Sequence, residues 1–137
     1  MPDKPEPRSM EARNDMMNKF PRLRQQPHVD DRDPEGLNHP YRLYRFMVPP
    51  KFVKDRSIAF VGMMQCLATS SIAHVQALWI SAFFGGKLER IHGSEDELHW
   101  QTMLHTQWAK LRYPAGSSYR YPDFVFDSIP YSTWTLP

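Results

Sequence analysis

The sequence predicts an α/β fold with few strands, and three observations lead to this prediction. Residues 41–50 and 57–62 combine bulky and β-branched side chains in the manner of short strands. An apolar segment of helical length follows a loop rich in Ser and Thr. Residues 94–112 open with a helix-capping pattern. Two strands and two helices rarely close an independent sheet, so the pattern is typical of the end of a larger domain.

The first 38 residues differ in composition from the rest. They are rich in charge and proline, and their few apolar residues follow no period. Such a segment cannot bury enough surface to offset the entropy lost on ordering. We therefore predict a disordered tail over residues 1–38, with at most a weak helical turn near 10–20, followed by an incomplete domain segment over 39–137.

Both strands are predicted from short runs. "YRLYRFMVPP" (41–50) alternates bulky and polar residues and ends at Pro49 and Pro50, which fits a strand that stops at the prolines. "SIAFVG" (57–62) is a compact apolar run that ends at Gly62. Its lack of alternation indicates a strand buried on both faces, as in a parallel sheet.

The first helix is expected over residues 72–84. Ser70 or Ser71 could cap its N-terminus, and Gly85 follows its last residue. Its apolar residues surround it on nearly every side, which predicts a buried helix. The main stripe consists of Ile72, Val75, Trp79 and Phe83.

The second helix is expected over residues 94–112. Ser94 and Glu97 form a capping box at its start. Its predicted apolar face consists of Trp100, Leu104, Trp108 and Leu111. A short helical turn is expected near residues 124–129, in an aromatic and proline-rich tail.

The uncharged stretch 57–86 admits two interpretations. It is long enough to cross a bilayer, which needs about 20 apolar residues. A polar cluster at residues 65–71 would then lie in hydrocarbon, where unsatisfied polar groups are costly. A strand, a polar loop and a capped helix accommodate every part of the stretch and are favoured, while membrane contact through 57–86 stays as the alternative.

Composition excludes several classes of function. The net charge is +2, from 17 basic and 15 acidic residues, so the chain lacks the basic surface of a nucleic-acid-binding protein. Cys66 is the single cysteine and permits no intrachain disulfide, and the N-terminus resembles no signal or transit peptide. We expect a cytoplasmic protein. His99 and His105 do not share a helix face, and no spacing typical of a metal site occurs.

The passage from the predicted strand through Gly62 into the Ser/Thr-rich loop is a natural edge for an anion or a cofactor. Backbone N–H groups and the dipole of the following helix favour negative charge there. Most such turns are only connections, so this pattern alone does not establish a site.

The residues of this region resemble the C-terminal part of flavin-containing monooxygenases. The family has a Leu-Tyr strand ending in Pro-Pro, a strand ending in Ile/Val-Gly, a Gln shortly after it, and a helix with Gln-Ala-x-Trp. The tail from residue 111 is similar to the closing segment of fungal members, and the resemblance covers about residues 40–137. The matching positions are Leu43, Tyr44, Pro49, Pro50, Val61, Gly62, Gln65, Gln76, Ala77 and Trp79.

The resemblance implies a flavoprotein of two dinucleotide-binding domains, one for FAD and one for NADPH. The family oxygenates nucleophilic nitrogen or sulfur, or inserts oxygen in Baeyer–Villiger reactions. Gln65 matches a glutamine near the flavin ring, and Gly62 would let the backbone approach it closely. The chain departs from the family at four positions, which are Cys66, Ala68, His74 and Leu78.

The 137 residues contain no G-x-G-x-x-G loop, which a dinucleotide fold needs for the pyrophosphate. We therefore expect a truncated monooxygenase-like chain that binds neither FAD nor NADPH alone, assign no catalytic residue, and leave its status as an enzyme open. A small-molecule substrate is expected only in the full-length context. The alternative is a non-enzymatic interaction protein or a membrane-associated protein that uses residues 57–86.

Overall fold

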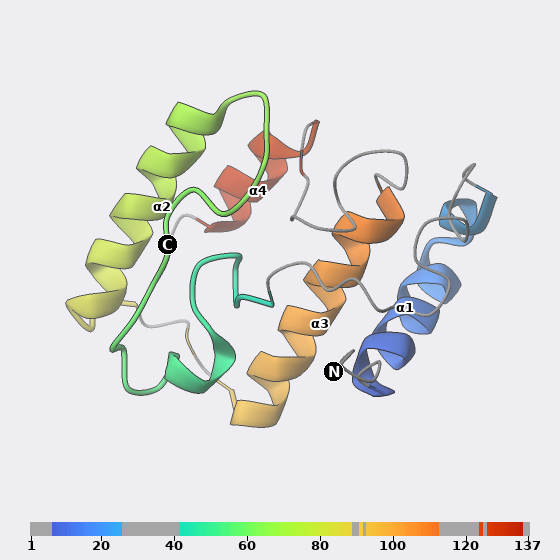
Figure 1. Ribbon diagram of the computed structural model, residues 1–137, viewed down its shortest axis with the longest axis horizontal. Coiled ribbons are helices and arrows are strands. Elements are labelled where there is room, and N and C mark those ends of the chain that lie inside the picture. Colours follow the sequence, from blue (N-terminus) through green and yellow to red (C-terminus); the bar gives the residue numbers. More distant parts are fainter. Residues whose placement is uncertain are drawn as a thin grey trace, which may run out of the picture.

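The computed structural model describes residues 7–25, 42–88, 91, 93–112, 124 and 126–135. Its helices are α1 (Pro7–Lys19), the 3-10 helices η1 (Pro21–Gln25) and η2 (Pro50–Phe52), α2 (Thr69–Phe84), α3 (Glu95–Arg112) and α4 (Ser128–Thr135). In Figure 1, α2 lies beside α4 and α3 lies beside α1, and the segment 42–68 runs between the two pairs. The arrangement is therefore mostly helical, and the described residues form no extended strand.

The first predicted strand, 41–50, is wrong, because the described residues 42–50 form a tight turn. Tyr44 and Val48 form an isolated antiparallel bridge, and the Met47 N–H donates to the Tyr44 carbonyl at 3.0 Å. Arg45 and Phe46 between them both have positive φ, at 51° and 59°. Two such residues in succession reverse the chain as in a type I′ turn, which alternation of side chains alone does not reveal.

The second predicted strand, 57–62, is also wrong as a strand buried on both faces. Its side chains at Ile58, Phe60 and Val61 are 39%, 40% and 47% exposed. The Phe60 N–H donates to the Met47 carbonyl at 2.8 Å, which ties the segment to the turn. Because no described strand lies beside it, its two faces have nothing to cover them.

Helix α2 confirms the predicted helix but not its cap. It begins at Thr69 after Ala68, and neither Ser70 nor Ser71 caps it. Ile72, Gln76, Trp79 and Phe83 form its buried stripe, while Leu78 and Phe84 are exposed, so the helix is not buried all round. It has 16 residues, and among the described residues no helix is both long and apolar enough to cross a membrane.

Helix α3 begins with the predicted capping box. The Glu97 N–H donates to Ser94 Oγ at 3.2 Å, and the Ser94 N–H donates to Glu97 Oε2 at 2.6 Å. Its buried residues do not follow the predicted stripe, since α1 packs on one side and the turn on another. They are Leu98, Thr102, Met103, Thr106, Gln107, Ala109 and Leu111.

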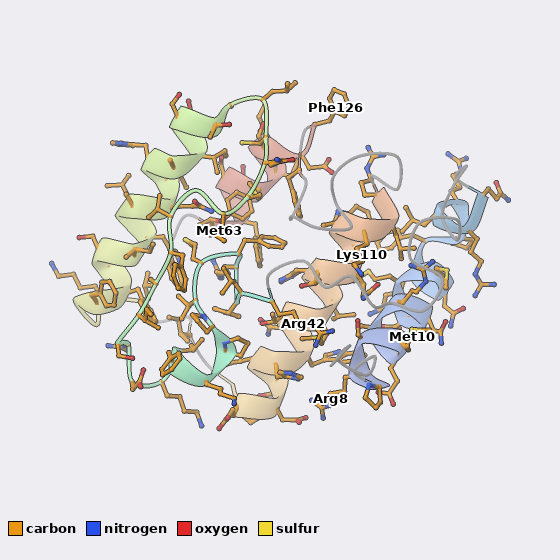
Figure 2. All side chains as sticks on the ribbon, in the orientation of Figure 1. Arg8, Met10, Arg42, Met63, Lys110 and Phe126 are labelled. Atoms are coloured by element: carbon orange, nitrogen blue, oxygen red, sulfur yellow. The ribbon has the colours of Figure 1, made fainter. Side chains whose placement is uncertain are left out.

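Residues 7–25, which the sequence places in a disordered tail, are helical and pack against α3. The contact is small and polar: Gln107 Nε2 donates to Ser9 Oγ, and both side chains are buried. Arg8 forms an ion pair with Asp96 at the start of α3 (Figure 2). An interface of this kind leaves no apolar periodicity in the sequence. Residues 1–6 and 26–41 lie outside the described residues, and the domain boundary near 38 stays a prediction.

Two apolar clusters meet at the turn. The first contains Tyr44, Met47, Val48, Val53, Trp79, Phe83 and Leu98. The second contains Phe46, Met64, Ile72, Ala109, Phe124 and Tyr131. Neighbouring turn residues thus enter different clusters, and the turn joins α2, α3 and α4 into one body.

We expect Phe46→Ala to lower the free energy of unfolding by about 3–5 kcal/mol, the usual loss for a buried Phe. Phe46 is fully buried, and its ring lies 5.0 Å from that of Phe124, measured between centroids. Urea unfolding followed by tryptophan fluorescence measures the change. Phe52→Ala at a partly exposed position is the control and should lose less than about 1 kcal/mol. A loss at Phe46 as small as that of the control would contradict the role assigned to the turn.

Candidate functional site

The two sequence-predicted site residues, Gly62 and Gln65, lie on the same loop between the turn and α2. Gly62 has a φ of +77°, a region that favours glycine, and a Cβ built on it would meet no atom within 4 Å. Gln65 is exposed, and its carbonyl accepts from the Phe124 N–H at 2.9 Å. The outer side of the loop is therefore open, and its inner side is tied to the protein.

A buried chain of hydrogen bonds ties the loop to the helices. The Gly62 N–H donates to Gln76 Oε1 at 2.9 Å, and Gln76 Nε2 donates to the Tyr131 hydroxyl at 2.9 Å. The Tyr131 hydroxyl in turn donates to the Arg45 carbonyl at 2.9 Å. We call these three bonds the Gln76 relay. It joins the loop, α2, α4 and the turn.

Both side chains of the relay are shielded from solvent. Gln76 is fully buried and Tyr131 nearly so. Burial raises the pKa of Tyr131, against the lowering effect of its hydrogen bond with Gln76, so the hydroxyl stays protonated and able to donate. A buried amide without partners would be costly, and this one uses both its donor and its acceptor.

Arg45 projects from the turn onto the end of α4. Its Nη1 donates to the carbonyls of Trp134 and Thr135 at 3.0 and 3.3 Å, in the last turn of that helix. Its guanidinium lies 4.7 Å from the centre of the Trp134 ring and 5.7 Å from that of Trp79. The cation therefore faces two aromatic rings and the negative end of a helix dipole, which both favour it.

His105 of α3 closes this cluster from the other side. Its ring lies 4.4 Å from that of Trp134, edge to face, and its Nδ1 is buried without a hydrogen-bond partner among the described residues. Burial, with the charge of Arg45 as a second cause, lowers the pKa of His105 from 6.5 to about 4. The imidazole is therefore neutral at pH 7 and packs as an aromatic ring.

The sequence analysis named Gly62 and Gln65 but not the residues that hold them. Gln76 lies in a stripe with Ile72, Trp79 and Phe83, and a polar residue at a buried helical position was the available signal. Arg45 and His105 gave none, because their proximity depends on the turn. Among the residues that the structure describes, no group of three His, Cys, Asp or Glu side chains is placed to hold a metal ion.

Comparison with known proteins finds relatives in *Aspergillus*-derived sequences that are all named FAD-dependent monooxygenases. The protein resA of Aspergillus sclerotiorum is 31% identical over 93 residues, which cover 66% of this chain and 16% of that protein. The protein rstn6 of Aspergillus nomiae is 30% identical over a match of the same extent. The protein avaB of Aspergillus versicolor is 46% identical over 52 residues, which cover 36% of this chain and 7% of that protein.

These matches support the resemblance to FAD-dependent monooxygenases over part of the chain. The matched stretch spans about 16% of the length of the first two relatives, so what those whole proteins do is not established for this chain. No family model matches the sequence, and no solved structure matches it. The two-domain fold, the use of NADPH and the roles of Gly62 and Gln65 stay predictions.

The low pKa of His105 predicts a loss of stability in mild acid. The folded-state pKa of about 4 lies below the ordinary value of 6.5, so the unfolded chain takes up the proton first. Stability is full above pH 6.5 and falls as the pH drops towards 4, by up to about 3 kcal/mol for this group. Urea unfolding at several pH values measures the effect.

His105→Gln should remove this part of the pH dependence. His74→Gln, at an exposed position of α2, is the control and should keep the wild-type slope. Equal slopes for the His105 variant and the wild-type chain between pH 6.5 and 4 would show that the imidazole is not held neutral by its surroundings.

Proposed function

We propose that this chain forms one edge of the FAD site in a monooxygenase, with the loop 62–65 facing the flavin ring. The observation that carries the proposal is the loop itself: the two residues that match the family motif, Gly62 and Gln65, lie on one exposed loop held from beneath by the Gln76 relay. The names of the relatives support FAD as the cofactor.

The residues present fit the ring of a flavin better than its pyrophosphate. The space outside Gly62 is open to a planar group, and the exposed carboxamide of Gln65 can donate and accept. A pyrophosphate needs a cradle of backbone amides in a glycine-rich turn, and no G-x-G-x-x-G occurs in the sequence. That part of the site would come from sequence outside these 137 residues.

When bound, FAD would supply the redox chemistry, with NADPH as the reductant, for oxygenation of a nitrogen or sulfur nucleophile or for Baeyer–Villiger insertion. The part of this chain is to orient the ring. Gln65 would bond its polar edge, and Gly62 would allow close approach of the backbone. No residue is assigned to proton transfer or to covalent catalysis, and the chain alone is not expected to turn over.

The exposed apolar side chains of the segment 57–62 add support. Ile58, Phe60 and Val61 lie in an extended run without a partner among the described strandless segments. A run of this composition is stable when neighbouring strands pair with it and cover its faces. We infer that in a protein of the relatives' length the run becomes a strand of a larger sheet, which recovers the predicted α/β architecture.

A second candidate is a non-enzymatic interaction protein. Leu67, Phe126 and Ile129 are 76%, 72% and 78% exposed, and Figure 2 shows Phe126 pointing away from the body of the protein ahead of α4. Exposed apolar side chains of this size are frequent at protein interfaces. This candidate needs no cofactor, so flavin binding separates it from the first.

The proposal predicts that FAD binding depends on Gln65 once the rest of a monooxygenase is present. A chimera would carry residues 40–137 in place of the corresponding segment of the Aspergillus sclerotiorum relative. It should retain FAD, and Gln65→Leu should weaken FAD binding by about tenfold through the loss of one hydrogen bond. Flavin absorbance after gel filtration and a fluorescence titration measure the binding.

Gln101→Leu on α3 is the matched control and should leave FAD affinity unchanged. The isolated chain should neither retain FAD nor oxidise NADPH. A folded chimera without FAD, or a Gln65 variant that binds FAD as the wild type does, would contradict the proposal. Tight FAD binding by the isolated chain would contradict the part that assigns the pyrophosphate cradle to other sequence.

A further inference from the structure

We propose that Gln76 is a positioning residue, which sets the conformation of the loop 62–65 and links it to α4 through Tyr131. The link between this loop and the flavin rests on the function proposed above. The positioning role itself rests only on the contacts of the relay, and it holds whatever ligand the loop meets.

The chemistry of the site requires an amide at position 76. One end of the side chain must accept from the Gly62 N–H, and the other must donate to the Tyr131 hydroxyl, which is itself committed to the Arg45 carbonyl. Leu or Met would pack in the stripe but would do neither. Ionised Glu would accept at one end only. Gln76 is fully buried, so water cannot replace a lost partner.

The loop depends on tethers because little of it is packed. Phe60 is bonded to the turn on one side of Gly62, and Gln65 is bonded to the Phe124 N–H on the other. Between them Gly62 adopts a φ of +77°, and the neighbouring Val61 is half exposed. The Gln76 bond is the tether at the middle of this span, and it reaches the core of the protein.

The relay also decides which groups of the loop are available outside. The Gly62 N–H points inward and is committed to Gln76. A ligand at the outer face would therefore meet the Gln65 carboxamide and the open space beside Gly62, and it would receive no hydrogen bond from the Gly62 amide. This separates the two family-motif residues into a group that binds and a residue that is bent and held.

Tyr131 extends the control to α4. Its hydroxyl accepts from Gln76 and donates to the carbonyl of Arg45, while the side chain of Arg45 bonds the last carbonyls of the same helix. Docking of α4 and placement of the loop are thus coupled through Gln76. Displacement of α4 would remove the acceptor that keeps the carboxamide oriented towards Gly62.

Amide exchange measured by NMR tests this role without any flavin. In Gln76→Leu, the Gly62 amide should exchange about tenfold faster than in the wild-type chain, as expected for the loss of one buried hydrogen bond. In Gln76→Glu it should stay within about threefold of wild type, because Glu keeps an acceptor for Gly62 whether it is ionised or protonated. Circular dichroism establishes that each variant is folded.

Gln107→Leu is the matched control, because Gln107 is also a buried helical glutamine but bonds α1 instead of the loop. It should leave Gly62 exchange unchanged. If Gln76→Leu fails to fold, Tyr131→Phe decides: it retains Gln76 and removes its acceptor, and Gly62 exchange should rise by about twofold to fivefold. Unchanged exchange in the folded variants of both positions, or equal acceleration in the control, would overturn the proposal.

The two proposals can fail separately. If Gly62 exchange responds as expected and the chimera retains no FAD, the positioning role stands and the proposed function falls. If the chimera retains FAD and Gly62 exchange does not respond, the reverse holds. In a chimera that retains FAD, Gln76→Leu should also weaken FAD binding, although residue 76 lies beneath the loop and has no path to the ring.

Discussion

The reversal of the chain at Arg45 and Phe46 is the constraint on which the rest of the structure depends. Two successive residues other than glycine hold positive φ there, at a cost of about 1–2 kcal/mol each. Such a conformation persists only where its surroundings stabilise it by more than that. Phe46 is buried among rings from α4 and the segment before it, and Arg45 is bonded to the end of α4. The turn and α4 therefore stabilise each other.

The charge of Arg45 shapes what surrounds it. The cluster at the end of α4 contains a buried imidazole, two indoles and helix carbonyls, and the groups described around the guanidinium include no carboxylate partner. Aromatic faces and a helix C-terminus stabilise a cation without neutralising it. The remaining positive potential disfavours a second cation, and this is one reason why the pKa of His105 is low. A single arginine thus fixes both a helix end and the protonation state of its neighbour.

The sequence predicted those elements whose cause is local and missed those whose cause is tertiary. Ser94 and Glu97 bond each other across one helical turn, and Gly85 and Gly86 end a helix within a few residues, so α3 and the end of α2 could be predicted. The strand at 41–50 was predicted from side-chain alternation, but positive φ at Arg45 and Phe46 is imposed by contacts with α4. Helix α1 was missed because Ser9 and Ala12 bury little apolar area and meet a polar partner in Gln107.

The same distinction applies to the candidate site. Gly62 and Gln65 were named from a family motif, and the motif says nothing of what holds them. The polar residue in the apolar stripe of α2 answers that question: an amide at position 76 is unfavourable in a buried helix face unless the loop and α4 both come to it. The resemblance and the packing therefore point to one loop for independent reasons. One comes from the similarity of this stretch to larger FAD-dependent proteins, and the other from the cost of burying Gln76 without partners.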